Sequence, residues 1–523
     1  MPRASTLAFF PAKRRTSVAR ATAVSTALSR APLGLAAPLV RVEVHLGSGL
    51  PTFVIVGLPE AVVRESKERV RAALSTCGFT FPVARITVNL SPADLPKEGG
   101  RFDLPIAIGI LTASGQLPRH ALERREFYGE LSLGGELRET PKLLPALIAG
   151  AQLGNELIVP SANALEASLA ACPQIRVAGH LRQICEFLRE GTPLPALPVM
   201  AAVRSANSAP PPDLADICGQ FSAKRGLEIA AAGDHGVLFM GPPGAGKTML
   251  AQRLPGILPP LRAEEALEVA SLESAAGHRP TPTGLRPFRN PHHTASTAAL
   301  IGGAGFLPGE LSLAHLGVLF LDELPEFARN ALEALREPLE SGVVVVARAK
   351  GTCVFPARFQ LVAAMNPCPC GYHGDSRGGC RCTETQVSRY RHRISGPLID
   401  RIDIHLAVPA LPAAQLAATA TVKAELSATV AHRVRAARQV QLDRQGKLNA
   451  RLHAEETLRM CCLDRAGRGL LGGAIARLGL SARAHQRILK LARTCADLAG
   501  EPQIGVEHVA EAVGLRAFDR QLA

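Results

Sequence analysis

The sequence contains no tryptophan and only three tyrosines among its 523 residues. Surfaces that stack the bases of single-stranded nucleic acids are built from aromatic rings, and this chain supplies few of them. It also lacks any apolar run near the ~18 residues that a membrane-spanning helix needs, so no membrane insertion is expected. Its twelve cysteines lack the even spacing of a small secreted disulfide scaffold. We therefore expect a cytoplasmic protein.

Acidic residues are missing from the first 42 positions, where arginine and lysine recur among serine, threonine and alanine. This composition has two interpretations. It is either an organellar transit peptide or a short extension, disordered over residues 1–17, that leads into a first strand near Val40. Over the whole chain, 59 basic and 45 acidic residues give a net charge of +14. Such an excess suits a polyanionic partner that is held mainly by electrostatic attraction.

A chain of this length exceeds what one hydrophobic core accommodates, so several domains are expected. Residues 191–212 are rich in proline, alanine and serine, which predicts a linker. Before it, residues 18–190 mix strand and helix patterns, as in an α+β or α/β domain. After it, residues 213–410 carry the apolar strands and Gly-rich turn of a P-loop sheet. Residues 411–523 are rich in alanine, arginine and leucine, and the pattern from about Thr421 predicts a helical domain.

Apolar spacing also predicts individual elements. Residues 39–56 are predicted as a hairpin or two strands, and residues 60–74 as a helix. Residues 343–359 are predicted as a hairpin that turns at Lys350 and Gly351. Further strands are expected at residues 86–90, 157–159, 236–240, 318–321 and 361–364, a short hairpin at 130–137, and helices at 104–114 and 143–153.

A phosphate-binding loop follows one of the apolar strands and precedes a predicted helix. In this motif, glycines let backbone N–H groups turn toward the phosphates, and the helix N-terminus adds partial positive charge. Lys247 is predicted to reach the β and γ oxygens of ATP, and the Thr248 hydroxyl to coordinate magnesium. The predicted ATP-binding residues of the loop are Gly241, Pro242, Pro243, Gly244, Ala245, Gly246, Lys247 and Thr248.

Two acids, Asp322 and Glu323, end a later apolar strand. Asp322 is predicted to hold hydrated Mg²⁺ together with Thr248. Glu323 is predicted to polarise the attacking water, which requires a carboxylate that the metal does not occupy. Asn366 ends another strand, where its amide either orients the water or contacts the γ-phosphate, or merely forms a turn before Pro367. ATP and Mg²⁺ are thus the expected cofactors.

Arg401 follows Leu398, Ile399 and Asp400, and it has two interpretations. It is either an arginine finger that a neighbouring subunit supplies to stabilise transition-state charge, or a partner of Asp400 or Asp403 in a local ion pair.

A Gly-rich loop carries four cysteines in the pattern C-x-C-x₉-C-x-C, at Cys368, Cys370, Cys380 and Cys382. Four thiolates suit tetrahedral Zn²⁺, although the C-x-C spacing is tighter than in common zinc pairs, and free thiols are the alternative. Three basic residues near this loop, Arg389, Arg391 and Arg393, are candidate contacts with nucleic acid, with a solvated basic surface as the alternative.

A family resemblance is carried by segments spread over the chain: VGLPEAVVRESKERVRAAL, NLSPADLPKEGGRFDLPIA, GPPGAGKT, RPFRNPHHT, FLDELPEF, NPCPCG, ISGPLIDRIDIH and LSARAHQRILKLARTCADL. From about Val18 to the C-terminus, the chain resembles the magnesium-chelatase-like AAA+ ATPases of the ComM (YifB) family. Cys218 departs from the pattern, which usually has an arginine there.

The resemblance implies an α/β fold with a P-loop AAA+ core, an N-terminal Lon-protease-like α+β domain and a C-terminal helical lid. It implies a hexameric ring that hydrolyses ATP and moves on branched or duplex DNA, as a branch-migration helicase in homologous recombination and natural transformation. Arg401 then matches the family's trans-acting arginine. Arg483 matches the sensor-2 arginine, with Arg487 as the alternative. The hairpin at residues 343–359 matches one that faces the pore, which makes Arg348 and Lys350 candidate DNA contacts; an ordinary exposed hairpin is the alternative.

A Lon-like domain raises the hypothesis of a protease, but Arg101 stands at the position that resembles the serine nucleophile, so proteolytic inactivity is expected. Two other functions share the ATPase core. A magnesium-chelatase motor subunit would not need the Lon-like domain, the cysteine loop or the basic excess. A protein-remodelling ATPase would have a turnover that is indifferent to DNA.

Overall fold

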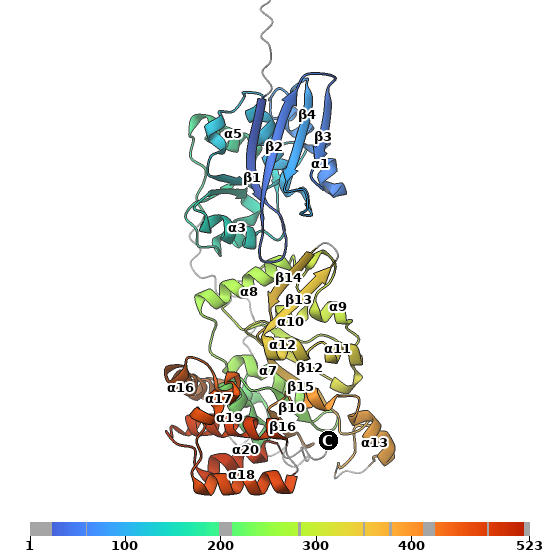
Figure 1. Cartoon of the computed structure of the whole chain (residues 1–523), viewed down its shortest axis with the longest axis vertical. Helices are drawn as coiled ribbons and strands as arrows, with labels where there is room; N and C mark the ends of the chain where they lie inside the picture. Colours follow the sequence, from blue (N-terminus) through green and yellow to red (C-terminus); the bar gives the residue numbers. More distant parts are fainter. Residues whose placement is uncertain are drawn as a thin grey trace, which may run out of the picture. The chain divides into compact units, whose positions relative to one another are not determined.

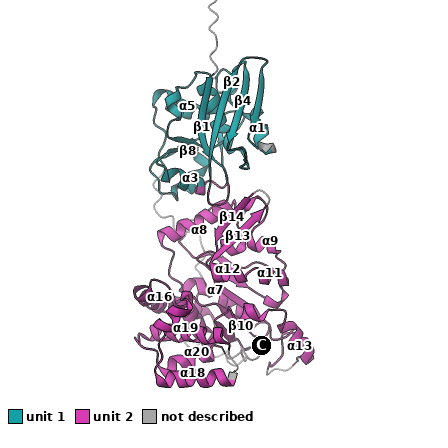
Figure 2. Ribbon diagram, in the orientation of Figure 1, with its two compact units in different colours: residues 1–32, 37–140, 146–198 teal, residues 33–36, 141–145, 199–523 magenta. Residues whose placement is uncertain are grey.

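The structure, a computed structural model, describes residues 23–58, 60–197, 212–280, 284–348, 351–375, 379–411, 424–478 and 481–516. It divides into two compact units (Figure 2). Unit 1 comprises Met1–Pro32, Ala37–Thr140 and Ala146–Pro198, and unit 2 comprises Leu33–Ala36, Pro141–Pro145 and Val199–Ala523. The predicted N-terminal extension, most of the predicted linker and Lys350 lie outside the described residues.

Unit 1 is built on a sheet of seven strands in the order β3-β4-β2-β1-β5-β8-β9 (Figure 1). Two strands form within residues 39–56, as predicted, but they are not a hairpin. The later strand β4 lies between them, antiparallel to β2 and parallel to β3. The strands are β1 (Ala23–Arg30), β2 (Leu39–Gly47), β3 (Thr52–Val56), β4 (Arg85–Ser91), β5 (Arg125–Phe127), β8 (Glu156–Pro160) and β9 (Ile175–Ala178).

Strand β1 corrects the expectation that the first strand begins near Val40. Its sequence, AVSTALSR, is small and polar, so it gives little hydrophobic signal. The small residues are required because a buried helix, α2 (Asp103–Ala113), packs closely on this strand. Ser25 donates a hydrogen bond of 2.7 Å to the carbonyl oxygen of Gly109 in that helix. A weakly apolar segment thus forms the central strand β1, because its small side chains allow α2 to pack closely on it.

The predicted helices of unit 1 are confirmed as α1 (Ala61–Thr76), α2 and α3 (Leu144–Gln152), and β6 (Glu130–Leu131) pairs with β7 (Leu137–Arg138) as the predicted short hairpin. Two helices that were not predicted, α4 (Ala164–Ser168) and α5 (Leu181–Glu190), follow them in the chain. Every residue of α2 is buried, which explains why its apolar residues lack a polar face.

Unit 2 contains a parallel sheet of five strands in the order β11-β12-β15-β10-β16. All residues of β10, β12 and β15 are buried, as expected for a parallel sheet that is covered on both faces. In such sheets, ligands bind beyond the carboxyl ends of the strands, where the order of the strands reverses. The strands are β10 (Val237–Met240), β11 (Phe288–Arg289), β12 (Val318–Leu321), β15 (Gln360–Met365) and β16 (Ile404–Ala407).

Short elements surround this sheet. The helices are α6 (Phe221–Gly233), α7 (Lys247–Ile257), α8 (Ala263–Ala275), α9 (Thr297–Ile301), α10 (Glu310–Leu313), α11 (Arg329–Glu333), α12 (Arg336–Ser341), α13 (Glu384–Arg391) and α14 (Gly396–Ile399). The predicted hairpin is confirmed: β13 (Val343–Arg348) pairs antiparallel with β14 (Gly351–Pro356).

The C-terminal part is helical, as predicted, and its helices gather together in the orange to red part of Figure 1. They are α16 (Ser427–Gln445), α17 (Ala454–Met460), α18 (Arg465–Leu478), α19 (Ala482–Ala499) and α20 (Val506–Gly514). Val434 of α16 and Ile488 of α19 share one buried cluster with Val237 and Phe239 of the sheet. These helices therefore share a core with the parallel sheet of unit 2. Among the described residues, none of the helices is both long and apolar enough to cross a lipid bilayer.

Candidate nucleotide-binding site

The phosphate loop lies between the end of β10 and the start of α7, as its motif requires. Gly244 and Gly246 adopt φ values of +76° and +91°, a left-handed conformation that glycine adopts without steric cost. A cavity of about 400 Å³ opens over this loop. Its lining brings together most of the predicted site: Pro243, Gly244, Ala245, Gly246, Lys247, Thr248, Met249, Asp322, Glu323, Met365 and Asn366.

Lys247 is held by three oxygen atoms. Its Nζ donates hydrogen bonds to the carbonyl oxygens of Gly241 (2.7 Å) and Pro242 (3.0 Å), and to Oδ1 of Asn366 (2.9 Å). Burial lowers the pKa of the Lys247 ammonium group, an effect that the nearby charges of Asp322 and Glu323 oppose. The contact between Lys247 and Asn366 joins the phosphate loop to the end of β15, so an amide lies beside the ammonium group that is predicted to bind phosphate.

Thr248 and Asp322 bring two oxygen ligands together. The Thr248 hydroxyl donates to Oδ2 of Asp322 at 2.8 Å, and the backbone N–H of Glu323 donates to Oδ1 at 2.9 Å. A hydroxyl and a carboxylate at this separation match the oxygen ligands that Mg²⁺ prefers. The residues present therefore fit a magnesium ion bound beside the phosphates.

Glu323 lies next to Asp322 with its backbone at φ +52°, a region that non-glycine residues rarely adopt. Its carboxylate is half exposed, and Oε2 lies 3.1 Å from Nδ1 of His293. Sequence reasoning assigned no role to His293, although the RPFRNPHHT segment contains it. The chain separates the two residues, and only the parallel pairing of β11 with β12 brings the end of one segment beside the end of the other.

The predicted arginines lie elsewhere. Neither Arg401 nor Arg483 is among the described residues that line the cavity of this subunit. Arg401 forms an ion pair with Glu340 and donates to the carbonyl oxygen of Pro397 at 2.7 Å. The predicted local pair of Arg401 with Asp400 or Asp403 is therefore replaced by a pair with a residue of α12.

Asp403 instead pairs with Arg487, the alternative sensor-2 candidate. Although burial alone would raise the pKa of Asp403, the positive charge of Arg487 and a 3.0 Å contact with His235 hold it well below its usual range. Arg483 is exposed in the first turn of α19. Of the two arginines, Arg487 thus forms a partly buried ion pair that joins α19 to the residue before β16.

The four cysteines of the loop after β15 converge. Their sulfur atoms all lie within 4.8 Å of one another. The Sγ of Cys368 lies 3.3 Å from that of Cys370 and 3.9 Å from that of Cys380. Four sulfurs around Zn²⁺ at ~2.3 Å are separated by about 3.8 Å, so this cluster has the size of a tetrahedral zinc site. The chemistry of the ligands, four thiols that include Cys382, also fits zinc.

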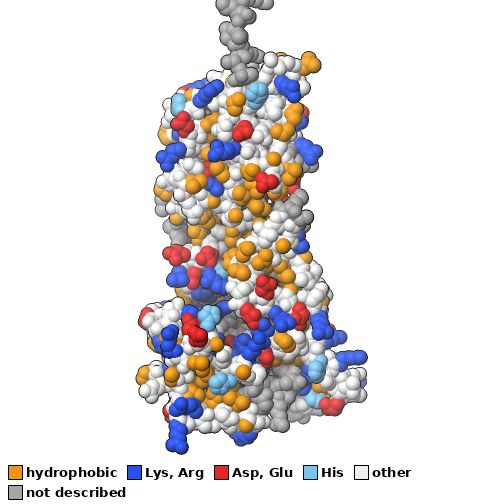
Figure 3. Space-filling view, viewed as in Figure 1, with side chains coloured by type: hydrophobic (Ala, Val, Ile, Leu, Met, Phe, Trp, Pro, Cys, Tyr) orange, Lys and Arg blue, Asp and Glu red, His pale blue; other side chains and the backbone are white. Residues whose placement is uncertain are grey.

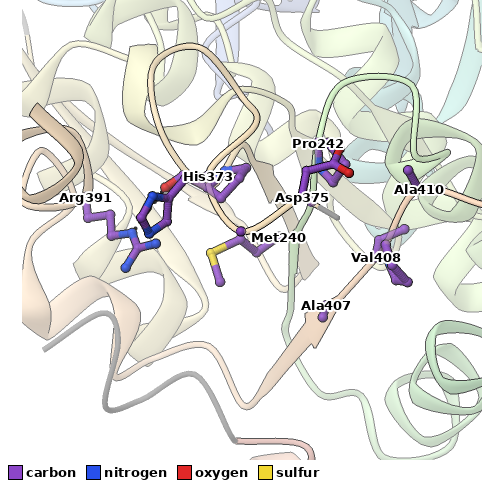
Figure 4. A pocket seen from close by; sticks show the side chains of 12 residues that line it. Met240, Pro242, His373, Asp375, Arg391, Ala407, Val408 and Ala410 are labelled. Carbon is purple, nitrogen blue, oxygen red and sulfur yellow. Dashed lines mark hydrogen bonds between the residues drawn. The ribbon is translucent and has the colours of Figure 1, made fainter. Parts of the chain in front are cut away.

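The cysteine loop contacts the phosphate loop. A Cβ added at Gly371 would lie 2.5 Å from Cδ of Pro243, so the two loops pack without space for a side chain. They also line a second cavity, of about 600 Å³, together with the end of β16. Figure 4 shows His373 and Arg391 on one side of this cavity and Val408 on the other. The cysteine loop therefore packs directly against the phosphate loop.

The predicted DNA-contacting residues differ in their availability. Arg348 is exposed, and its Nη2 donates to the carbonyl oxygen of Gly302 at 3.3 Å. Arg389 is exposed on α13, whereas Arg393 pairs with Glu326 at 2.7 Å and Arg391 donates to the backbone of Pro367. In the view of Figure 3, lysine and arginine side chains are interspersed with acidic ones.

Comparisons with known proteins cover nearly the whole chain. Three family models match: "Subunit ChlI of Mg-chelatase" over residues 42–163, "Magnesium chelatase, subunit ChlI" over residues 213–416, and "Magnesium chelatase, subunit ChlI C-terminal" over residues 424–516. The chain is 50% identical to competence protein ComM of Haemophilus influenzae over 499 residues, which is 94% of this chain and 97% of that protein.

Two further relatives differ in how much of the chain they match. The chain is 48% identical to the protein YifB of Salmonella typhimurium over 497 residues, which cover 94% of this chain and 97% of that protein. Its similarity to the magnesium-chelatase 38 kDa subunit of Rhodobacter capsulatus is 30% identity over 171 residues, 29% of this chain and 49% of that subunit. The alignment with that subunit thus covers only a part of each chain.

Proposed function

Because this chain belongs to the ComM (YifB) family of magnesium-chelatase-like AAA+ proteins, we propose that it is a magnesium-dependent ATPase that translocates on branched or duplex DNA. The observation that carries the ATPase part is the convergence of Lys247, Thr248, Asp322, Glu323 and Asn366 on one cavity. These residues supply a cation, two oxygen ligands, a carboxylate and an amide within one site.

Each residue of the cavity has a role in this proposal. Lys247 binds the β and γ oxygens of ATP, and Thr248 and Asp322 hold Mg²⁺, which supplies Lewis-acid stabilisation of phosphate charge when bound. Glu323 accepts a proton from the attacking water. Asn366, which already contacts Lys247, orients that water or contacts the γ-phosphate.

A homo-oligomeric ring, proposed as a hexamer, completes the site. Arg401 and Arg483 are outside the cavity lining of their own subunit among the described residues, which suits arginines that act across a boundary or after a lid movement. We assign Arg401 as the trans-acting finger and Arg483 as the sensor-2 arginine. In such sites a finger contributes ~10³-fold or more to turnover.

DNA is proposed as the polymer on two grounds. The chain carries a net charge of +14, and the relative with half of its residues identical is named a competence protein. Recombination during natural transformation is the process that the family resemblance implies. We propose that the exposed side chains of Arg348 and Arg389 contact DNA. The other proposed contacts are Lys350, Arg391 and Arg393.

Two further assignments accompany this function. The cysteine cluster holds Zn²⁺, which stabilises the loop against the phosphate loop. Unit 1 is a Lon-protease-like domain that lacks proteolytic activity, because Arg101 carries no nucleophile and its side chain is buried. Burial lowers the pKa of that guanidinium to about 10, so it stays charged at neutral pH.

The test is steady-state ATPase activity with and without a four-way DNA junction, across a salt series, beside Glu323→Gln. Each phosphate that the protein neutralises adds ~0.9 to the salt slope of DNA binding, so stimulation by the junction should fade steeply as salt rises. Turnover that the substitution abolishes and that DNA leaves unchanged would favour the chelatase-type or protein-remodelling alternative. Turnover that survives Glu323→Gln would contradict the assigned site.

A further inference from the structure

The thiols of the cysteine cluster are both close together and accessible. The four sulfur atoms lie within 4.8 Å of one another. Cys368 is buried, whereas Cys370, Cys380 and Cys382 are partly exposed. The Sγ atoms of Cys370 and Cys380 are 3.7 Å apart. A small oxidant in solution can therefore reach two thiols that are already neighbours, which is the arrangement that disulfide formation requires.

The other cysteines of the chain are less available to such an oxidant. All twelve cysteines are among the described residues, and outside the cluster only Cys218 and Cys462 are not buried. A disulfide needs two thiols that meet, so the cluster is the place in this chain where several accessible thiols offer that reaction.

The reaction is a two-electron oxidation of two thiolates by a peroxide. The thiolate of Cys370 attacks one peroxide oxygen, the O–O bond breaks, and a sulfenic acid forms while hydroxide leaves. The thiolate of Cys380 then attacks that sulfur, so that an S–S bond forms, the S–O bond breaks and a second hydroxide leaves. Both hydroxides take up protons from the solvent and become water. The cluster then retains only two of the four thiolates that are proposed to hold zinc.

The segment that carries these cysteines contacts the nucleotide-binding site at two points. Gly371 directly follows Cys370 and packs so closely against Pro243 that an added Cβ would lie 2.5 Å from Cδ of that proline. Asn366 begins the segment, and its Oδ1 accepts a hydrogen bond of 2.9 Å from Nζ of Lys247. A disulfide brings the two sulfur atoms from 3.7 Å to about 2.0 Å apart, so Cys370 and its neighbour Gly371 move relative to the phosphate loop.

Hydrogen bonds within the segment join its two contact points. The backbone N–H of Gly371 donates to the carbonyl oxygen of Cys368 at 3.0 Å, and the backbone N–H of His373 donates to Sγ of Cys368 at 3.3 Å. Cys368 is only two residues from Asn366 along the chain. A displacement of Gly371 is therefore passed to the residue that contacts Lys247.

We propose that the cysteine cluster is an oxidation site, at which a peroxide joins Cys370 and Cys380 in a disulfide and thereby weakens ATP binding at the phosphate loop. This inference rests on the proposed function, since it takes Lys247 and Asn366 as parts of an ATP site. The reduced cluster holds its loop in place against Pro243, and the disulfide displaces it. The loss of one hydrogen bond of the site corresponds to an affinity for ATP that is about two- to tenfold lower. Thiol reductants reverse the reaction.

The test compares the reduced full-length protein with the same protein after treatment with hydrogen peroxide. Peptide mapping by mass spectrometry should find a disulfide between Cys370 and Cys380, and a chromogenic chelator should detect the release of about one zinc ion per chain. Titration with a fluorescent ATP analogue should show an affinity that is about two- to tenfold lower. Dithiothreitol together with Zn²⁺ should restore it.

Two double variants make the test specific. Cys370→Ser/Cys380→Ser removes both reacting thiols, so its affinity for the ATP analogue should not change on peroxide treatment, whatever that affinity is beforehand. Cys218→Ser/Cys462→Ser is the matched control, because it removes the thiols outside the cluster that are not buried, and it should respond to peroxide like the wild type.

The outcomes separate this inference from the proposed function. Disulfides confined to other cysteines would overturn the assigned site, as would a response to peroxide that persists in Cys370→Ser/Cys380→Ser. A disulfide between Cys370 and Cys380 that leaves ATP affinity unchanged would overturn the link to the phosphate loop. If the reduced wild type does not bind the ATP analogue, the proposed function fails instead, while the peptide map still decides whether the cluster is the oxidation site.

Discussion

Arg487 and Arg483 lie one turn apart on α19. The structure predicts that losing Arg487 lowers the stability of the protein, whereas losing Arg483 weakens ATP binding or hydrolysis. Arg487→Ala leaves the buried carboxylate of Asp403 with His235 as its remaining side-chain partner among the contacts described above. Breaking a buried ion pair in this way costs about 3–5 kcal/mol. Since the Arg487 side chain is 23% exposed, water compensates in part, and we expect a loss of about 2 kcal/mol.

The assay is thermal unfolding combined with titration of a fluorescent ATP analogue. A loss of about 2 kcal/mol should lower the melting temperature of unit 2, most of which is Val199–Ala523, by about 3 °C in Arg487→Ala. Arg483→Ala is the matched control, because its side chain is exposed on the same helix; it should melt like the wild type but bind or hydrolyse ATP less well. A melting temperature of Arg487→Ala within about 1 °C of the wild type would refute the reasoning, as would an equal drop in Arg483→Ala.

Three further predictions follow from contacts of unit 2. The pKa of Asp403 is held below the unfolded value of ~3.9, so the ionised carboxylate stabilises the fold above that pH, and this contribution is lost as the pH falls below it. The difference in melting temperature between Arg487→Ala and the wild type should therefore shrink on acidification from pH 7 to about pH 3. Gly371→Ala should weaken ATP binding severalfold, because the added Cβ would clash with Pro243. Gly374→Ala is the control: this glycine also has a positive φ, but no atom lies within 4 Å of the added Cβ, so ATP binding should not change. Equilibrium titration with ATP measures both affinities. Cys368→Ser should reduce zinc measured by elemental analysis from one ion per chain and lower the melting temperature.

Most elements of the fold could be predicted because burial and periodicity are local signals. The strands of the P-loop sheet are short apolar runs, and β12 has the predicted bounds. Strand β1 was missed because its small, polar residues conceal a central position in the sheet. The pairing of β2 with β4 was also unpredictable from the local pattern, since register and neighbour depend on residues distant in the chain.

The sequence by itself determined which groups the candidate site contains: the phosphate loop, its lysine and hydroxyl, the two adjacent acids and the asparagine each follow an apolar run that forms a strand. What only the tertiary structure decided is which partner each side chain takes. Arg401 pairs with Glu340, and Arg487 pairs with Asp403. His293 lies beside Glu323. A motif specifies groups that are neighbours along the chain. Ion pairs and hydrogen bonds between distant segments depend on how strands and helices pack, because a few ångströms decide whether two charges meet.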